Sequence, residues 1–413
     1  MIPVIGGGPA GRLAAIRLAR AGREVELIEN RRIGGQCLHH GCMVICALSD
    51  VARLIQRARL LSELQVINGT FEVSFPHLLA EMQDIQKKIE SVLDAETRDA
   101  GVAIRYESSG SVRGRDVYVN GEKVDAEAVI IATGSRPAVP DTAGTALPNV
   151  YNPHTLTRMH RLPERMAIIG CGVMGAEFAH VFNAFGTEVH LICRSGFLKD
   201  LDPMLRKQAR RELEGVEIRE NAIIRGIQGE EKADAVVVDE GGEEKVIDVD
   251  AVFLASGLIP RSECVEGIKK GTLGEILVDD HMRTSVEGIY ACGDVAGPPY
   301  LTPIARMEGM VAADNILGKD RKMDYSFIPQ SISLFNDLAF CMPPAGAAIA
   351  AAIPSPAGPG SFWSVPTGNT GITKILVEPE NGKISGRVNP LHLMVIFNFR
   401  ESIETFPDIP IWP

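Results

Sequence analysis

The stretch VIGGGPAG, residues 4–11, decides the fold that this sequence predicts. It places the motif Gly6-x-Gly8-x-x-Gly11 between a short apolar run and a helical pattern. Gly6 permits a tight turn, Gly8 lets the backbone approach a pyrophosphate, and Gly11 lets the helix pack closely on the strand. Glu29 ends the next apolar run, where a carboxylate binds the hydroxyls of an adenosine ribose. The unit is therefore predicted to bind a dinucleotide.

A second copy of this pattern begins at GCGVMGAE, residues 170–177, with glycines at Gly170, Gly172 and Gly175. Two copies in one chain predict two dinucleotide-binding domains. The position equivalent to Glu29 is Cys193, and Arg194 follows it. A cation there, in place of an acid, favours a ribose 2′-phosphate and hence NADPH over NADH. The alternative, in which Arg194 is an ordinary solvated loop residue, leaves the coenzyme open.

Three closely spaced cysteines follow the first unit, in GGQCLHHGC (residues 34–42) and at Cys46. If Cys37 and Cys42 share the start of one helix, their sulfurs lie about one turn apart, close enough to form a disulfide. A helix N-terminus also stabilises a thiolate. A metal site is the competing interpretation, but the spacing does not match the usual zinc patterns, and no metal is predicted. Cys46 is either an apolar core residue or a third redox partner.

Composition excludes several partners. The chain has 413 residues, 53 of them acidic and 42 basic, with a net charge of −11. Such a surface has no general attraction for nucleic acid or an anionic membrane. The apolar stretch at residues 346–353 is too short to span a bilayer. The N-terminus enters a strand at once, which leaves no room for a signal peptide and predicts a cytoplasmic protein.

These motifs together resemble the FAD-dependent pyridine nucleotide–disulfide oxidoreductases, which include dihydrolipoamide dehydrogenase, glutathione reductase and mercuric reductase. GGQCLHHGC is similar to the family's GGTCxxxGC signature, and GCGVMGAE to its second nucleotide motif. IATGSRP (131–137) resembles the turn between the two nucleotide domains. YACGD (290–294) resembles the second FAD motif, and LTPIA (301–305) the segment beside the flavin.

The resemblance implies an α/β fold with two FAD/NAD(P)-binding Rossmann-like domains and a C-terminal α+β interface domain that forms a homodimer. The implied ranges are 1–139 with 256–318 for FAD, 140–255 for NAD(P), and 319–413 for the interface. The implied cofactors are FAD and either NADP or NAD. The implied catalytic residues are Cys37, Cys42 and Glu177. The implied cofactor-binding residues are Gly6, Gly8, Gly11, Glu29, Thr133, Gly134, Asp294, Gly170, Gly172, Gly175 and Arg194.

Family chemistry implies that electrons pass from the nicotinamide through the flavin to the disulfide, with Cys42 facing the flavin and Cys37 exchanging with the substrate. The sequence departs from the family at three places. The last cysteine is Cys341, so the C-terminal vicinal Cys pair of mercuric reductase is missing and that activity is not expected. Cys46 stands where the family has a Lys that pairs with the Glu at 177, and His392 lacks the acid that follows the family's catalytic His. The segment 405–410 is the candidate for a degenerate counterpart of that motif.

Two functions follow from these departures. The first is a dihydrolipoamide-dehydrogenase-like reductase acting on a small-molecule or protein disulfide. The second is a flavoprotein that passes electrons to a protein or quinone acceptor without turning over a disulfide.

Overall fold

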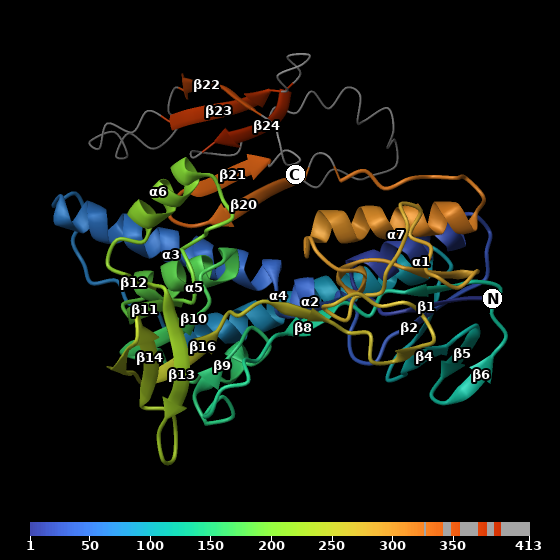
Figure 1. The fold of residues 1–413 in the computed structure, drawn as a ribbon, viewed down its shortest axis with the longest axis horizontal. Coiled ribbons are helices and arrows are strands. Elements are labelled where there is room, and N and C mark those ends of the chain that lie inside the picture. Colours follow the sequence, from blue (N-terminus) through green and yellow to red (C-terminus); the bar gives the residue numbers. More distant parts are fainter. Residues whose placement is uncertain (326–327, 342–347, 356–370, 378–383, 390–413) are drawn as a thin grey trace. The chain divides into compact units, whose positions relative to one another are not determined.

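The computed structural model describes the chain except for residues 326–327, 342–347, 356–370, 378–383 and 390–413. It divides into two compact units (Figure 1). The first contains Met1–Ile328 and Ser333–Phe335, and the second contains Pro329–Ile332 and Asn336–Pro413.

A parallel five-stranded sheet forms the first half of the larger unit. Its strand order is β19-β7-β1-β2-β3. The strands are β1 (Ile2–Ile5), β2 (Val25–Ile28), β3 (Ala103–Arg105), β7 (Val129–Ile131) and β19 (Ile289–Ala291). All four residues of β1 are buried, which explains why the first apolar run has no polar alternation. Helices α1 (Pro9–Arg20) and α7 (Thr302–Ile316) lie side by side (Figure 1).

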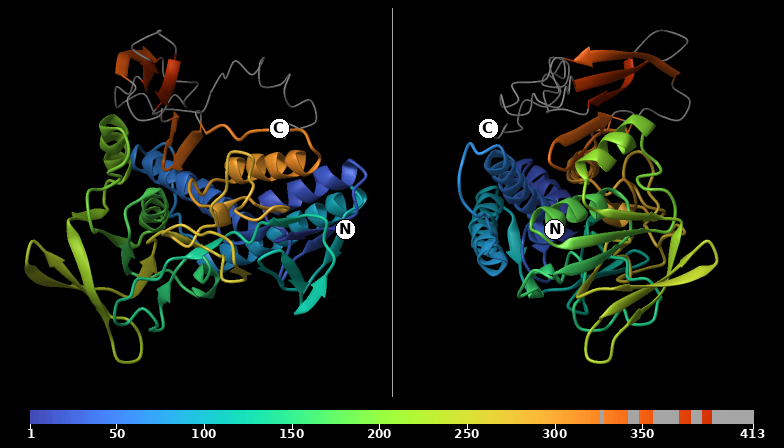
Figure 2. Two further views of the ribbon diagram at one scale, coloured as in Figure 1. Left: turned by 45° about the vertical axis from the view of Figure 1, so that its right-hand side comes forward. Right: turned by 90° about the vertical axis from the view of Figure 1, so that its left-hand side faces the viewer.

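A second parallel sheet has the order β12-β11-β10-β16-β9. Its strands are β9 (Val150–Tyr151), β10 (Arg165–Ile169), β11 (Glu188–Cys193), β12 (Glu217–Glu220) and β16 (Ala251–Leu254), with helices α5 (Val173–Ala184) and α6 (Pro203–Glu212). An antiparallel layer beside it, yellow-green in Figure 2, consists of β13 (Ala222–Gln228), β14 (Ala235–Glu240) and β15 (Glu243–Asp248). Val236, Val238 and Ile247 of this layer share one apolar core with Ile169, Ile192 and Val252 of the sheet.

Two neighbouring strands connect the halves. The chain leaves the first sheet through β8 (Ser135–Pro137) and returns through β17 (Leu258–Pro260), and these two pair antiparallel. The chain then adds β19 to the first sheet. The first sheet is therefore built from segments that come before and after the second sheet in the sequence. The exact residue ranges of the three domains stay a prediction.

Smaller elements complete this unit. A four-stranded sheet has the order β18-β4-β5-β6. Its strands are β4 (Gly110–Arg113), β5 (Asp116–Val119), β6 (Glu122–Val124) and β18 (Val265–Glu266). The dipeptide Asn120-Gly121 is typical of a tight hairpin turn, and the structure confirms the hairpin that it predicts between β5 and β6: both residues have positive φ, at 51° and 84°, as a type I′ turn requires. Two short 3₁₀ helices are η1 (Leu156–Arg158) and η2 (Asp294–Ala296).

Three helices follow β2: α2 (Gly35–His39), α3 (Cys42–Glu63) and α4 (Phe75–Asp99). The amphipathic pattern between residues 46 and 100 predicts two long helices, and both are present, interrupted between Glu63 and Phe75. The segment Gly35–Glu63 is long and apolar enough to cross a membrane by length and composition alone. In this structure the segment is attached to α5: Gln56 forms a hydrogen bond with His180, and Arg59 donates one to the Ala184 carbonyl at the end of that helix.

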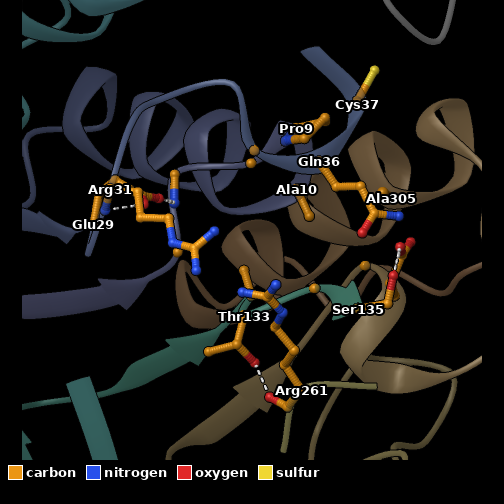
Figure 3. A pocket seen from close by; sticks show the side chains of 18 of the residues that line it. Pro9, Ala10, Glu29, Arg31, Gln36, Cys37, Thr133, Ser135, Arg261 and Ala305 are labelled. Atoms are coloured by element: carbon orange, nitrogen blue, oxygen red, sulfur yellow. Dashed lines mark hydrogen bonds between the residues drawn. The ribbon is translucent and has the colours of Figure 1, made fainter. Parts of the chain in front are cut away.

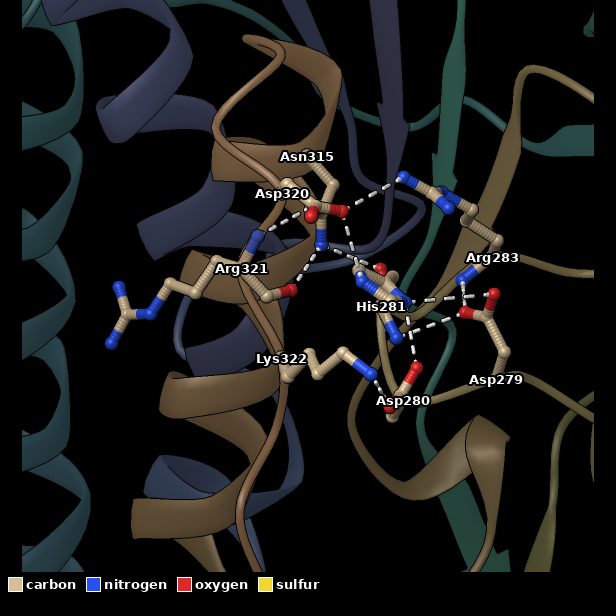
Figure 4. Close-up of polar contacts among 8 residues, drawn as sticks. All are labelled: Asp279, Asp280, His281, Arg283, Asn315, Asp320, Arg321 and Lys322. Carbon is tan, nitrogen blue, oxygen red and sulfur yellow. Dashed lines mark hydrogen bonds and ion pairs between the residues drawn. The ribbon is translucent and has the colours of Figure 1, made fainter.

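A polar network attaches the end of α7 to the loop before β19 (Figure 4). Asn315 donates hydrogen bonds to the carbonyls of His281 and Arg321 at 2.9 and 2.7 Å. The potential metal ligands of Asp279, Asp280 and His281 lie within 4.8 Å of one another. Asp280 is already bound by Lys322 at 2.8 Å, and His281 contacts Asp280 at 2.6 Å. The network therefore serves as a structural connection.

The second unit is an antiparallel sheet over the residues that the structure describes. Its order is β20-β21-β24-β23-β22. The strands are β20 (Pro329–Ser333), β21 (Asp337–Cys341), β22 (Ala348–Ser355), β23 (Gly371–Val377) and β24 (Ile384–Asn389). The alternating run at 372–378 predicts β23, and the structure confirms that strand. His392 and residues 405–410 lie outside the described residues.

Candidate active site

Glycine is required at the first and third positions of both nucleotide turns. Gly6 has φ of +109°, and a Cβ there would lie 2.3 Å from the Ala132 carbonyl oxygen. A Cβ on Gly11 would lie 2.0 Å from the Gly6 oxygen. The second turn repeats this pattern: a Cβ on Gly170 would approach Ala255 O to 2.4 Å, and one on Gly175 would approach Gly170 O to 1.8 Å. These contacts explain the glycines through protein packing alone.

The middle glycines are different. A Cβ on Gly8 would meet only the Cα of Gly35, at 3.9 Å, and one on Gly172 would meet no protein atom within 4 Å. Each has φ near −75°, which any residue adopts. Neither packing nor backbone conformation requires glycine at these two positions. Both stand immediately before a helix, where open space and free N–H groups suit a pyrophosphate.

A cavity of about 430 Å³ opens beside the first turn (Figure 3). Its lining includes Gly6 to Ala10, Glu29, Thr133, Gly134 and Asp294, together with Cys37 and Cys42. In Figure 3, Glu29 and Cys37 lie on opposite sides of the view. Apart from Gly11, which packs against the Gly6 oxygen, the sequence-predicted residues of the first nucleotide site and the cysteine pair are thus brought to one cavity.

Glu29 holds the turn as well as facing this cavity. Its carboxylate accepts hydrogen bonds from the Gly7 N–H at 2.7 Å and the Arg31 N–H at 2.8 Å, and its side chain is buried. At the other end of the lining, Ser135 donates to Asp294 at 2.5 Å. Burial raises the pKa of Asp294. Thr133 donates to the Arg261 carbonyl at 2.6 Å, which fixes the turn after β7.

The spacing predicts that the two cysteines share the start of one helix, and this prediction is wrong. Cys37 lies in α2, whereas Cys42 is the first residue of α3. The break is at Gly41, where a Cβ would lie 3.1 Å from Gln36 O and 3.2 Å from Cys37 Cα. This close return of the backbone places the second cysteine at a fresh helix N-terminus and still beside the first. The pair is present as two thiols.

The two sulfurs differ in acidity. A hydrogen bond from Cys37 lowers the pKa of Cys42 to about 6, and the Thr302 hydroxyl, 3.6 Å away, and the Cys42 N–H lower it further against the effect of burial. The same hydrogen bond, together with burial, raises the pKa of Cys37. At neutral pH the reduced pair is therefore a Cys42 thiolate beside a neutral Cys37 thiol.

Three histidines line the cavity, His39, His40 and His154, and the sequence assigns a role to none of them. The rings of His40 and His154 stack with centroids 4.3 Å apart, and His154 contacts the Gln36 Oε1 at 3.0 Å. Burial and the neighbouring His154 lower the pKa of His40 to about 3; burial and two arginines lower that of His154 to about 4. His40 lies inside the cysteine motif, but no local signal in the sequence connects His154 with it.

Other predicted residues lie elsewhere. Glu177 is not part of the cavity lining, and its carboxylate accepts a hydrogen bond from the Ser333 N–H at 2.9 Å. Cys46 is exposed on α3. Arg194 is exposed just beyond β11, next to the buried Cys193. The second nucleotide turn and Arg194 thus form a region separate from this cavity.

Comparison with known proteins shows which family this chain is part of. The model of the pyridine nucleotide-disulphide oxidoreductase family matches residues 2–309. The chain belongs to this family. Its members act on disulfide substrates and are typically dimeric, and they use a flavin and a nicotinamide coenzyme.

Similar sequences include a dihydrolipoyl dehydrogenase from Chlamydia muridarum, 32% identical over 81% of this chain and 74% of that protein. A mercuric reductase from Staphylococcus aureus is 30% identical over 79% of this chain, which spans only 61% of that protein. Among solved structures, the Cu(II) complex of the HOCl-induced flavoprotein disulfide reductase RclA from Escherichia coli superposes with a TM-score of 0.81. The alignment covers 98% of this chain and 93% of that one at 24% identity, which shows the shared fold.

Proposed function

We propose that this protein is an NAD(P)H-dependent FAD disulfide reductase. In this proposal electrons pass from the nicotinamide through FAD to Cys37 and Cys42, and from there to a small-molecule or protein disulfide. One observation carries the proposal: an acidic thiol and a neutral thiol contact each other at the wall of a cavity whose other residues form a dinucleotide turn.

The residues of the cavity fit FAD. The open space at Gly8 and the N-terminus of α1 suit its pyrophosphate, the Glu29 carboxylate its adenosine ribose, and Asp294 its ribityl chain. When bound, FAD supplies the step that converts a two-electron hydride into thiol–disulfide chemistry. Glu29 and the glycine-rich turn would hold this group, and Cys42 and Thr302 line the same cavity.

The thiol pair itself performs the exchange. Cys37 holds its proton in a hydrogen bond to the Cys42 thiolate, so Cys42 is placed to take that proton as the Cys37 sulfur attacks the substrate disulfide. One S–S bond forms between Cys37 and the substrate, and the first substrate thiolate leaves. Cys42 then attacks Cys37, gives its proton to the leaving group, and releases the second thiol. Two electrons leave the protein, which ends as the disulfide.

Proton supply to the leaving thiol limits this reaction. The described histidines of the lining are His39, His40 and His154. Burial lowers the pKa of all three, to about 3 for His40 and about 4 for His154, so they are neutral at pH 7. They are therefore poor proton donors at that pH. Lipoamide and glutathione disulfide are expected to be slow substrates for this reason.

A second function is favoured by the surroundings of Glu177. The family Lys that would face it is replaced by Cys46, and the Glu177 carboxylate binds the Ser333 backbone. The replacement removes a positive charge beside Glu177, and neither Glu177 nor Cys46 lines the cavity that contains the thiol pair. We propose as the alternative that electrons pass from the flavin to a protein or quinone acceptor.

An anaerobic titration of FAD-loaded protein with NADPH and NADH, followed by an acceptor screen, tests both functions. For a disulfide reductase, Cys37→Ser and Cys42→Ser each abolish reduction of lipoamide or glutathione disulfide. For the alternative, a soluble quinone is reduced equally well by both variants and the parent. Failure of both coenzymes to reduce the bound flavin contradicts both functions. We also propose a homodimer, which sedimentation of the same sample tests.

A further inference from the structure

A second pair of cysteines lies in the other nucleotide region. Cys171 stands in the second glycine-rich turn, and Cys193 is the last residue of β11. Strands β10 and β11 are neighbours that pair in parallel with Ile169 opposite Ile192, so Cys171 follows the carboxyl end of β10 and Cys193 forms the carboxyl end of β11 (Figure 1). The Gly170 N–H donates to the Ile192 carbonyl at 3.0 Å, one residue before each cysteine, so the backbone brings the two thiols into the same place, where they influence each other's acidity. They are 22 positions apart in the sequence, and only the strand pairing brings them together.

The two thiols are not equivalent. Cys193 is fully buried, with its Sγ 3.8 Å from the Leu191 carbonyl oxygen. Cys171 is half-buried and so reachable by a small solute, and its Sγ lies 3.8 Å from the Gly196 carbonyl oxygen. The hydrogen bond from Cys193 lowers the pKa of Cys171 and raises that of Cys193. Cys171 thus has the features of an attacking thiol, and Cys193 those of a resolving thiol.

Both residues adjoin the space that a coenzyme needs. Gly172, next to Cys171, has open space at its Cβ position. Cys193 occupies the position at which dinucleotide domains place the ribose-binding acid. We propose that a peroxide oxidises Cys171 and Cys193 to a reversible disulfide, and that this disulfide weakens binding of the nicotinamide coenzyme. This inference rests on the proposed function, because it takes the second turn as the coenzyme site.

The reaction balances with one peroxide. The Cys171 thiolate attacks a peroxide oxygen, the O–O bond breaks, and the leaving hydroxide takes a proton to form water. The Cys193 sulfur then attacks the resulting sulfenic acid, an S–S bond forms, and the S–O bond breaks. The hydroxide that leaves takes the Cys193 proton as a second water, and the two thiols have supplied two electrons.

The bridge opposes coenzyme binding through geometry. A covalent bond between the turn and the end of β11 holds Cys171 against the strand and removes the freedom of the turn to adjust around a pyrophosphate. It also draws the sulfurs together between the turn and the ribose position. The first pair, Cys37 and Cys42, lies at the other nucleotide region and serves electron transfer, so oxidation at the second pair would act on coenzyme entry instead.

The test uses full-length, FAD-loaded protein treated with hydrogen peroxide, with free thiols then alkylated and the peptides mapped by mass spectrometry. A peptide linked through Cys171 and Cys193 is expected, and dithiothreitol should remove it. Calorimetry with NADP⁺ and NAD⁺ on the same samples should show that the dissociation constant rises about tenfold or more on oxidation, about 1.4 kcal/mol. Reduction should restore the original affinity.

Matched variants assign the effect. Cys171→Ser and Cys193→Ala should each abolish the peroxide effect on affinity, whereas Cys46→Ser should keep it. Because Cys193 is buried, Cys171→Ser decides the outcome if Cys193→Ala fails to fold. Absence of the linked peptide, or unchanged affinity when it is present, overturns the inference. Failure of the reduced protein to bind either coenzyme contradicts the proposed function instead, and the peptide map then still decides whether the bridge forms.

Discussion

The Sγ of Cys42 lies 3.6 Å from the Oγ1 of Thr302, so the first residue of α3 contacts the first residue of α7. These residues are 260 positions apart in the sequence. Two helix N-termini thus meet at one sulfur, and both favour negative charge there. The acidity of Cys42 follows from this arrangement.

The first prediction concerns that acidity. In the reduced protein, alkylation of Cys42 by iodoacetamide should rise with pH to half its maximal rate near pH 6, because only the thiolate reacts. Thr302→Val removes a hydrogen bond to the thiolate and should move the midpoint upward by about one unit. Thr302→Ser retains the hydroxyl and should leave it in place. An unchanged midpoint in Thr302→Val would show that the hydroxyl does not stabilise the thiolate.

The second prediction concerns the electronic spectrum. Two-electron reduction of FAD-loaded protein should leave the Cys42 thiolate beside oxidised flavin and produce a long-wavelength charge-transfer band. Cys42→Ser should abolish this band, and Cys37→Ser should strengthen it because Cys42 then has no disulfide partner. If both variants behave like the parent under anaerobic reduction, the pair is structural.

Cys46 is tested in the same Cys37→Ser variant. Cys42 and Cys46 are four residues apart on α3 and share one face of the helix. Mass spectrometry of the oxidised variant should show Cys42 without a disulfide if Cys46 has no redox role. A linkage between Cys42 and Cys46 would instead make Cys46 a third redox partner.

The third prediction concerns the coenzyme. Stopped-flow reduction of the flavin should be faster with NADPH than with NADH, because the exposed Arg194 follows Cys193 at the ribose position. Arg194→Glu should reverse the preference by repelling a 2′-phosphate, whereas Arg194→Lys should preserve it. An equal or higher rate with NADH in the parent would rule out this role for Arg194.

The fourth prediction separates packing from binding within one glycine motif. Gly11→Ala places a Cβ 2.0 Å from the Gly6 oxygen and should destabilise the protein by about 3 kcal/mol in denaturant unfolding. Gly8→Ala meets only the Gly35 Cα at 3.9 Å and should change the stability of FAD-free protein by less than about 0.5 kcal/mol.

The same two variants are then compared for FAD affinity by fluorescence titration. Gly8→Ala should bind FAD more weakly, since the added methyl group projects into the cavity beside α1. Wild-type affinity in Gly8→Ala would mean that the pyrophosphate does not approach this turn.

Local patterns were informative wherever the backbone itself imposes the requirement. The glycines of both turns, the Asn120-Gly121 hairpin and the two long helices are readable because positive φ, close approach and helical periodicity depend on residues near in sequence. The prediction that Cys37 and Cys42 share one helix start was wrong because the backbone breaks between them. At Gly41 the backbone turns back and packs against Gln36 and Cys37, and the spacing of the cysteines does not reveal this close contact.

The sequence by itself determined the two dinucleotide units, the cysteine pair and the family, since each depends on short motifs in fixed order. Only the tertiary structure decided that Thr302 contacts Cys42, that His154 stacks on His40, and that Cys171 meets Cys193. Such contacts depend on strand order and on the packing of distant segments, which no local spacing encodes. They also set the acidity of the thiols, because hydrogen bonding and burial act through whatever group the fold brings into contact.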